Sequence, residues 1–353
     1  MRNKTLGILG GGQLGRMSAL AAACLGIDTV IFCPEKNNPA SRVSTSFINA
    51  EYDDQETLKY FADQVDFITY EFENIPIETV RYLNKHKPVF PDEKLLEVSQ
   101  DRISEKSFLN EIGIDTTRWK KFKSSESLEQ TFTEWNCSTL ILKTARFGYD
   151  GKGQIKINKG DNINDAIRIL NGDIIIEDKV DFQYEISVIC ARDKEKNMVV
   201  YGPMLNEHKD HILHKTTIPA ALPKDIADKS ISMVKTLAEK IDLRGILTLE
   251  LFVTKGGELL ANEIAPRTHN SGHWSMDACA HSQFDQHIRA VCGLPVIEPY
   301  RHSDVTMLNL IGEDINLVQN YLDRPEAVTH DYGKNEVREG RKMGHINILS
   351  PKS

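Results

Sequence analysis

Two apolar runs on either side of a Gly-Gly pair predict a β-hairpin between residues 246 and 264. In the first run every second residue is leucine or valine, which gives one face made of Leu247, Leu249, Leu251 and Val253. The residues between them form a second face that carries Glu250. This alternation predicts a strand with its aliphatic face in a core and an acid on the opposite face.

The register of this hairpin brings two acids together. A two-residue Gly-Gly turn places Lys255 opposite Glu258. The same register places Glu250 opposite Glu263, although like charges directly opposite each other destabilise a sheet. A cation between them removes that cost, and carboxylate oxygens suit Mg²⁺. The alternative is an exposed hairpin with two solvated glutamates. Asn262 points to the other face unless a bulge re-aims it.

The segment after the hairpin, up to residue 274, has neither helical nor strand periodicity. It carries side chains suited to a small polar or anionic ligand: Arg267, His269, Asn270 and Ser271. The spacing of His269 and His273 would also suit a zinc helix. However, the intervening Asn-Ser-Gly is poor helix material and no third ligand lies near, so a binding loop is the favoured interpretation.

Composition narrows the class of protein. The chain has 353 residues and a net charge of −8, so it has no general basic surface for nucleic acid. Its six cysteines form no Cys-x-x-Cys pair and are typical of reduced thiols in a cytoplasmic protein. The longest early apolar stretch, residues 19–27, is too short to span a bilayer. We expect a cytoplasmic enzyme with no membrane or nucleic-acid partner.

The chain opens with an apolar strand at residues 5–9, a glycine-rich turn and an Ala-rich helix, followed by a strand at residues 29–33. Three glycines of the turn have G-x-G-x-x-G spacing: Gly10, Gly12 and Gly15. This pattern predicts a doubly wound domain. Taken alone it also suggests an NAD-dependent oxidoreductase, with Glu35 where a ribose-binding acid falls. A third strand at residues 65–69 leads into acids that include Glu73, at the edge where such sheets bind ligands.

Residues 92–112 have a helical pattern with Arg102 and Lys106 on the polar side, and the first domain boundary is placed near Ser99. A second glycine loop then separates strands at residues 140–143 and 155–157. The Walker motif is absent, so the loop is interpreted as a flexible lid over phosphates, with Lys143 as a fixed positive charge. A buried strand, an acidic linker and Glu185 follow, and together these features indicate a nucleotide site between two sheets.

These residues resemble the carboxyaminoimidazole ribonucleotide synthetases, which are ATP-grasp carboxylases of purine biosynthesis. The resemblance rests on four motifs that span almost the whole chain: Gly-Gly-Gly-Gln-Leu-Gly-Arg-Met (10–17), Gly-Tyr-Asp-Gly-Lys-Gly-Gln (148–154), Asn-Glu-Ile-Ala-Pro-Arg-Thr-His-Asn-Ser-Gly-His-Trp (262–274) and Gly-Arg-Lys-Met-Gly-His (340–345).

The resemblance implies a two-stage reaction. Bicarbonate and ATP form carboxyphosphate, and the carboxyl group then passes to the exocyclic amine of 5-aminoimidazole ribonucleotide. The implied cofactors are ATP and Mg²⁺, and a homodimer is expected. The implied ATP-binding residues are Arg102, Lys143, Gly148, Tyr149, Asp150, Gly151, Lys152, Gly153, Gln154, Glu177, Asp178, Lys179, Val180, Glu185, His208, Asn262 and Glu263. The implied metal ligands are Glu250 and Glu263.

On the ribonucleotide side, the resemblance implies five catalytic residues, namely Tyr149, Asp150, Lys152, Arg267 and His269. It implies six further substrate-binding residues, namely Gln13, Glu73, Asn270, Ser271, Lys334 and Arg341. A regular metal role for His208, His211 and His214, which recur every three residues, is disfavoured because such histidines more often contact solvent or nucleotide.

The expected architecture is an ATP-grasp fold of mixed α/β and α+β class. It consists of a doubly wound N-terminal domain (1–99), an ATP-grasp domain that includes the lid (100–298) and a small β-rich C-terminal domain (299–353). Two functional alternatives remain besides the oxidoreductase. One is an ATP-grasp ligase that acts on a related ribonucleotide, and the other is a silent ATP-binding regulator.

Overall fold

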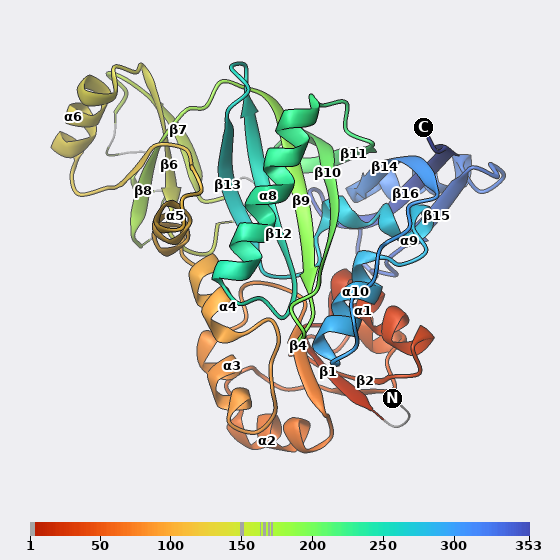
Figure 1. Ribbon diagram of the computed structural model, residues 1–353. Coiled ribbons are helices and arrows are strands. Elements are labelled where there is room, and N and C mark those ends of the chain that lie inside the picture. Colours follow the sequence, from red (N-terminus) through yellow and green to blue (C-terminus); the bar gives the residue numbers. More distant parts are fainter. Residues whose placement is uncertain (1–3, 149–151, 163, 165–166, 169, 171) are drawn as a thin grey trace.

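The computed structural model describes residues 4–148, 152–162, 164, 167–168, 170 and 172–353. It contains three sheets with helices packed around them (Figure 1). Within these residues, no helix is both long and apolar enough to cross a membrane. All six cysteines are free thiols.

The N-terminal sheet is parallel and has the strand order β3-β2-β1-β4. Its elements are β1 (Thr5–Leu9), α1 (Gln13–Cys24), β2 (Asp28–Phe32), the short 3₁₀ turn η1 (Ala40–Arg42), β3 (Ser46–Ile48), α2 (Gln55–Asp63), β4 (Phe67–Tyr70) and α3 (Ile77–Asn84). The predicted strand, glycine turn, helix and strand are confirmed. The glycine turn and the residues after β4 lie at the carboxyl edge of this sheet, where parallel sheets bind ligands.

The helical pattern of residues 92–112 forms two helices, α4 (Glu93–Ser99) and α5 (Arg102–Glu111). The break arises because the Asp101 carboxylate accepts hydrogen bonds from the backbone N–H groups of Ile103 and Ser104, which caps a new helix. The placement of Lys106 on the polar side is wrong. Its side chain is fully buried, because Glu177 from another element supplies a partner for the ammonium group.

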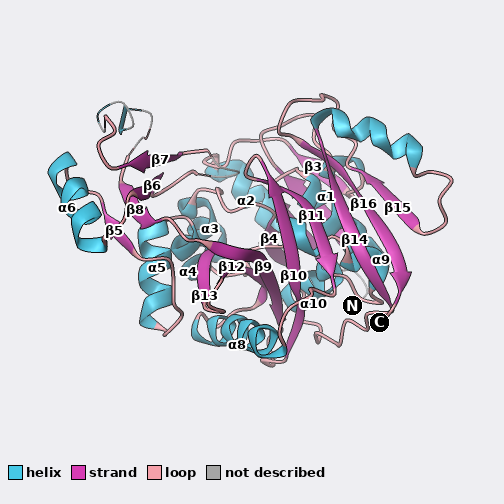
Figure 2. Ribbon diagram, turned by 90° about the horizontal axis from the view of Figure 1, so that it is seen from above, coloured by secondary structure: helices cyan, strands magenta, loops and turns pink. Residues whose placement is uncertain are grey.

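A small antiparallel sheet follows, with the order β5-β8-β6-β7. It comprises β5 (Trp119–Lys121), α6 (Ser125–Trp135), β6 (Thr139–Thr144), β7 (Gln154–Asn158) and β8 (Ile174–Asp178). Helix α6 packs on one face through Leu128, Phe132 and Trp135. The sheet stands apart from the rest of the molecule, beside α5 (Figures 1 and 2). The lid loop connects β6 to β7.

The central sheet has eight strands in the order β13-β12-β9-β10-β11-β14-β16-β15. Its elements are β9 (Phe182–Arg192), β10 (Met198–Lys209), β11 (Ile212–Ile218), α8 (Lys224–Lys240), β12 (Gly245–Thr254), β13 (Leu259–Ala265), η2 (Asn270–Gly272), α9 (Ser275–Ala278), α10 (Gln283–Val291), β14 (Ser303–Ile311), η3 (Gly312–Asn320), β15 (Ala327–Asp331) and β16 (Lys342–Pro351). The C-terminal strands therefore extend the same sheet that carries the hairpin, and Lys342, at the start of β16, lines the cavity described below.

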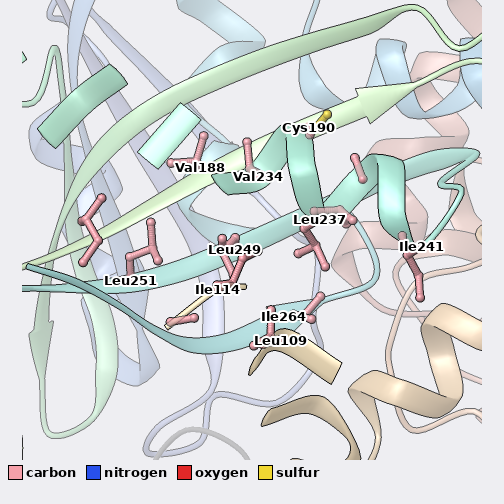
Figure 3. Packing of buried hydrophobic residues seen from close by; sticks show 14 of the residues in the cluster. Leu109, Ile114, Val188, Cys190, Val234, Leu237, Ile241, Leu249, Leu251 and Ile264 are labelled. Atoms are coloured by element: carbon pink, nitrogen blue, oxygen red, sulfur yellow. The ribbon is translucent and has the colours of Figure 1, made fainter. Parts of the chain in front are cut away.

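The aliphatic face of β12 packs as the alternation predicts. Leu247, Leu249, Leu251 and Val253 join the core that α8 covers with Val234, Leu237 and Ile241. Figure 3 shows Leu249 and Leu251 directed toward this helix. Burying one such side chain contributes roughly 1.5–3 kcal/mol, so the aliphatic face fixes which way Glu250 points.

The hairpin pairs Glu250 with Glu263 as predicted, but by a different route. The two-residue turn is wrong, because Val253 pairs with Leu259 and the Thr254 N–H donates to the Glu258 carbonyl, which leaves a three-residue turn. A bulge between Glu250 and Leu251 then takes up Asn262 and restores the pairing of the glutamates. The longer turn has its glycine, Gly257, at a φ of 82°, which favours that residue.

Candidate active site

The site is a cavity of about 520 Å³ between the N-terminal sheet, the small sheet and the central sheet. Every one of these parts contributes to its wall. Gln13 begins α1, Glu73 follows β4, Lys143 lies in β6 and Glu185 lies in β9. The lining is rich in charged and polar side chains, which suits a phosphorylated ligand better than an apolar one.

The hairpin forms one wall through Glu250, Asn262 and Glu263. The bulge lets Asn262 line the cavity beside Glu263, and the Asn262 Oδ1 atom is buried with no hydrogen-bond partner in the described residues. A buried oxygen without a donor is costly unless a ligand or cation completes it. Two carboxylates and an amide oxygen are the hard donors that Mg²⁺ prefers, so this set fits the ion.

Glu250 is held in its ionised form. Burial by itself would raise its pKa, but a hydrogen bond from His269 and the nearby charges of His269 and His208 lower the pKa to about 2. The His269 Nε2 atom lies 2.9 Å from Glu250 Oε1. The other ring nitrogen, Nδ1, lies 2.8 Å from the Ser271 hydroxyl, which fixes the ring orientation.

Ser271 does not reach the cavity. It is fully buried, and its hydroxyl lies 2.7 Å from that of Ser187 on β9. Asn206 on β10 donates to the Ser187 hydroxyl in turn at 2.8 Å. Ser271 thus orients His269 from behind, and His269 orients the Glu250 carboxylate.

Arg102 lies between the hairpin and the lid. Its Nη1 atom is 3.4 Å from Glu263 Oε2, and its Nη2 donates to the Gly148 carbonyl at 3.5 Å. Glu105, one turn further along α5, also lines the cavity and accepts a hydrogen bond from the Ile264 N–H. Burial, together with the charge of Glu263, raises the pKa of Glu105 to about 8 against the opposing charge of Arg102.

Lys143 presents its ammonium group to the cavity from the small sheet. Its Nζ lies 2.7 Å from Glu177 Oε2, and the second oxygen of Glu177 lies 3.1 Å from Lys106 Nζ. Burial alone would raise the pKa of Glu177, but the two lysines lower it to about 2. The Glu177 side chain therefore pairs with lysines and does not line the cavity.

An ion pair between Arg267 and Glu73 joins the loop after β13 to the N-terminal sheet. Burial opposes the charged forms, but the charge and hydrogen bond of Arg267 lower the pKa of Glu73 to about 2, and Glu73 in turn raises the pKa of Arg267. Asn270, in the same loop, lines the cavity, and its amide nitrogen and oxygen are both buried without a partner in the described residues.

The glycine loop between β1 and α1 binds a carboxylate of the same chain. The Glu71 carboxylate accepts from the Gly12 N–H at 2.5 Å and from the Gly15 N–H at 2.9 Å, at the N-terminus of α1. A Cβ on Gly12 would lie 2.5 Å from Glu71 Oε1, and one on Gly10 would lie 2.4 Å from Glu71 Cγ. The glycine spacing is thus explained by an internal carboxylate that occupies the place of a dinucleotide phosphate.

The cavity collects sixteen of the residues that the resemblance implies: Gln13, Glu73, Arg102, Lys143, Gly148, Lys152, Gly153, Gln154, Glu185, His208, Glu250, Asn262, Glu263, Arg267, His269 and Asn270. Seven others lie outside its lining: Glu177, Asp178, Lys179, Val180, Ser271, Lys334 and Arg341. Tyr149, Asp150 and Gly151 lie outside the described residues.

One of the residues outside the lining, Lys334, lies close behind it. Lys334 donates to the Lys342 carbonyl at 2.7 Å, and Lys342 itself lines the cavity. Burial, with the charge of Arg341, lowers the pKa of Lys334 to about 8.

Glu185 and His208, on adjacent strands, form an ion pair across the cavity wall, and this pair raises the pKa of His208 against the effect of burial.

Sequence reasoning did not assign roles to Glu71, Glu105, Phe252, His211 and Lys342, all of which line the cavity. A signal existed for two of them. Glu71 belongs to the acidic segment after the third strand, and Lys342 belongs to the motif 340–345. Glu105 lies one turn from Arg102 on the same helix, but pattern alone cannot tell an acid that faces a cavity from one that faces solvent.

The zinc alternatives receive no support from the ring positions. His269 contacts Glu250, whereas the His273 ring lies 3.2 Å through Nδ1 from the Gln283 amide. Outside the cavity, ligand atoms of Asp277, His330 and His345 lie within 4.8 Å of one another. The two imidazoles are stacked at 14°, and because a metal-bound nitrogen points to its ion within the ring plane, parallel planes do not converge on one ion.

Comparison with known proteins agrees with this arrangement. Residues 107–284 match the model of the ATP-grasp domain, residues 3–100 that of the ribonucleotide synthetase preATP-grasp domain, and residues 305–353 that of the phosphoribosylaminoimidazole carboxylase C-terminal domain. The fold and the cavity thus define an ATP-grasp protein, which confirms the predicted fold class.

An N5-carboxyaminoimidazole ribonucleotide synthase of Brucella melitensis is 46% identical, over 99% of this chain and 97% of its own. The chain belongs to the N5-carboxyaminoimidazole ribonucleotide synthase family, as the motifs indicated. A Staphylococcus aureus structure with ADP has a TM-score of 0.93 and 34% identity, covering 99% of this chain and 94% of its own. An Aspergillus clavatus structure with ADP and 5-aminoimidazole ribonucleotide has a TM-score of 0.91 and 26% identity, with the same coverage.

Proposed function

We propose that this chain uses ATP and bicarbonate to carboxylate the exocyclic amine of 5-aminoimidazole ribonucleotide. The products would be carboxyaminoimidazole ribonucleotide, ADP and phosphate. The observation that carries the proposal is a single cavity that joins a carboxylate-bearing hairpin, a lysine beneath a glycine lid and a polar loop facing the N-terminal domain. The relatives with bound ADP and ribonucleotide support the same pair of ligands.

The nucleotide end is assigned to the side of the cavity formed by the small sheet and the hairpin. Lys143 and Arg102 provide positive charge there, and the lid residues Gly148, Gly153 and Gln154 line the same side. Phosphoryl transfer depends mainly on positioning and on charge complementary to the transition state, which these cations supply. Glu185, paired with His208, is assigned to the ribose hydroxyls.

The metal end is assigned to Glu250, Glu263 and Asn262. The unpartnered Asn262 oxygen and the two facing carboxylates fit Mg²⁺, as described above. When bound, the ion would neutralise charge on the phosphates of the nucleotide. His269 holds Glu250 ionised and oriented for that purpose.

The ribonucleotide end is assigned to the side formed by the N-terminal domain and the polar loop. The Asn270 amide is available because its donor and acceptor have no partner among the described residues. Gln13, which begins α1 and lines the cavity there, is assigned to the ribonucleotide phosphate. Lys334 and Arg341 are assigned to the same phosphate, from just behind Lys342.

The chemistry proceeds in two steps. A bicarbonate oxygen forms a bond to the γ-phosphorus of ATP and ADP leaves, which gives carboxyphosphate. The exocyclic amine then attacks the carboxyl carbon, phosphate leaves and the amine loses a proton. Carboxyphosphate is readily hydrolysed, so exclusion of water from the cavity is part of the function.

The test is ADP release by the purified protein with bicarbonate, Mg-ATP and 5-aminoimidazole ribonucleotide, leaving out one component at a time. We expect turnover only when all components are present. ADP release that does not depend on the ribonucleotide would contradict the assignment. Turnover with a different amino ribonucleotide in its place would instead favour a related ATP-grasp ligase.

A homodimer and a cytoplasmic location also remain part of the proposal. Light scattering of the purified protein tests the first, and fractionation of the source cells tests the second. The oxidoreductase alternative has no comparable support, because Glu71 already occupies the anion position of the first glycine loop.

A further inference from the structure

A fully buried lysine lies in the middle of α5. Lys106 has no exposed surface, although an ammonium group is costly to remove from water without a partner. Its Nζ donates to the Thr117 hydroxyl at 2.9 Å and lies 3.1 Å from Glu177 Oε1. None of these three side chains lines the cavity, so Lys106 touches neither of the proposed ligands directly.

Glu177 connects this lysine to the cavity. Its second oxygen lies 2.7 Å from the Nζ of Lys143, and the side chain of Glu177 is only 3% exposed. One carboxylate is thus shared by a buried lysine from α5 and a cavity lysine from β6. Strands β6 and β8 are neighbours in the small sheet, whereas α5 lies outside it.

Helix α5 also carries Arg102, another cation of the cavity lining. Arg102 precedes Lys106 by four residues, so the two side chains lie on one face of the helix. Arg102 contacts Glu263 of the hairpin and the Gly148 carbonyl of the lid. The helix therefore places one cation at the hairpin and, through Lys106 and Glu177, fixes the lysine of the small sheet.

We propose that Lys106 is a positioning residue for the nucleotide: by anchoring Glu177, it holds the ammonium group of Lys143 at a fixed place relative to Arg102. A carboxylate shared by two lysines leaves net positive charge on the trio, and the exposed end of that charge is Lys143. Without Lys106, the Glu177 carboxylate loses its link to α5, and the position of Lys143 relative to Arg102 is no longer fixed. This inference rests on the proposed function, because it assumes that a nucleotide binds at Lys143.

The proposal differs from a purely structural role in what it predicts. Removing one partner of a buried ion pair leaves the other charge without its partner, which lowers stability. A purely structural Lys106 would therefore affect the melting temperature and leave nucleotide affinity unchanged in the folded variant. A positioning Lys106 affects nucleotide affinity and leaves affinity for the ribonucleotide, which binds at the other end, unchanged.

The experiment is calorimetric titration of ADP into the full-length protein and into Lys106→Met. We expect ADP to bind about 10-fold to 100-fold more weakly to the variant, the range typical when a residue that orients a ligand-binding group is lost. The matched control is Lys121→Met on β5 of the small sheet, because the ion pair of Lys121 with Asp173 is exposed. That control is expected to stay within about twofold of the parent protein.

Equal ADP affinity in folded Lys106→Met would overturn the inference. If the parent protein bound no ADP at all, the proposed function would fail instead, so the two failures are distinct. If Lys106→Met does not fold, the double variant Lys106→Met with Glu177→Gln removes both buried charges. It is expected to bind ADP as weakly as predicted for the single variant, and parent-like affinity in this double variant would overturn the inference.

Discussion

Two glycine-rich loops border the same cavity, one in the N-terminal domain and one in the small sheet. In the first, between β1 and α1, the backbone N–H groups of Gly12 and Gly15 are taken by the Glu71 carboxylate. In the second, between β6 and β7, the described glycines Gly148 and Gly153 lie at the cavity near Lys143. The first loop thus binds the Glu71 carboxylate of its own chain, whereas the second lies next to the Lys143 ammonium group.

Glycine spacing alone therefore does not identify a phosphate site. In the first loop the absence of side chains makes room for Glu71, since a Cβ on Gly12 would collide with it. In the second, Gly153 has a φ of 72° just before β7, and its carbonyl accepts a hydrogen bond of 2.8 Å from the N–H of Thr144 at the end of β6. The charge next to a loop indicates which ligand it is available to bind.

The largest change that we expect is a loss of activity when the proposed metal site is altered. Glu250→Gln keeps the shape of the side chain but removes a charge from the proposed metal site. We expect turnover to fall by a factor on the order of 10³, because transition-state charge loses its compensation. Steady-state ADP release measures it.

Glu258→Gln provides the control, because Glu258 is exposed directly after the turn of the same hairpin. It is expected to retain activity close to that of the parent protein. Near-normal turnover of Glu250→Gln, with unchanged circular dichroism in both variants, would refute the metal assignment.

The ion pair between Arg267 and Glu73 joins the loop after β13 to the N-terminal sheet, and it makes the free energy of unfolding depend on pH. The pKa of Glu73 is lowered from 4.5 to about 2, so its contribution to stability is complete above about pH 4.5 and is lost as the pH falls toward 2. We expect Glu73→Gln to reduce the free energy of unfolding by about 2–3 kcal/mol at neutral pH, and by much less near the lower limit. Urea unfolding at several pH values measures both.

A constant difference between Glu73→Gln and the parent protein across that pH range would show that the charge of Glu73 is not the source of its contribution. Arg81→Gln is a suitable control, because its ion pairs with Glu78 and Glu97 are at the surface. We expect that variant to stay within about 1 kcal/mol of the parent protein.

A double-mutant cycle tests whether Gly12 makes room for the Glu71 side chain in the first loop. Gly12→Ala places a methyl group against Glu71, and we expect it to cost about 1–2 kcal/mol of unfolding free energy. The same change made together with Glu71→Ala should cost less than the sum of the single changes, because the collision is gone.

Strict additivity in the cycle would mean that Gly12 is not needed to make room for the Glu71 side chain. Gly256→Ala is the matched control, since a Cβ there meets nothing closer than 3.7 Å. Thermal or urea unfolding measures all four variants.

The smallest effect concerns the second loop. Phe147 lines the cavity with 72% of its surface exposed and a φ of 63°, a region that is strained for a residue with a side chain. Phe147→Gly should raise the free energy of unfolding by about 0.5 kcal/mol, since relief of strain exceeds the added freedom of the unfolded chain. A drop of more than about 1 kcal/mol in urea unfolding would contradict it.

Much of the fold was accessible from periodicity, because the core is built from regular alternation. The strands of the N-terminal sheet and the aliphatic face of β12 follow directly from such patterns. The broken helix at Asp101 was not recognised, because a capping aspartate inside a helical pattern looks like any polar position.

Only part of the site could be predicted from the sequence, and the residues that were not predicted have a common feature. The buried position of Lys106 depends on Glu177, which is 71 positions away, and the role of Glu71 depends on glycines about 60 positions earlier. Long-range pairing of this kind leaves no local pattern. The motifs of the family supplied most of the remaining lining residues, and the adenine linker Asp178–Val180 stays a prediction.

The bulge at Asn262 has a consequence for how many donors a strand can offer. A regular strand turns alternate side chains to one face, so a two-stranded wall offers one donor from each strand at a given level. The extra residue presents Asn262 and Glu263 side by side while Glu250 still lies opposite Glu263. Removing that residue would leave the carboxylates aligned, since the turn register alone then pairs them. The number of oxygen donors at the proposed metal site is therefore set by backbone length, and one residue changes it without altering either acid.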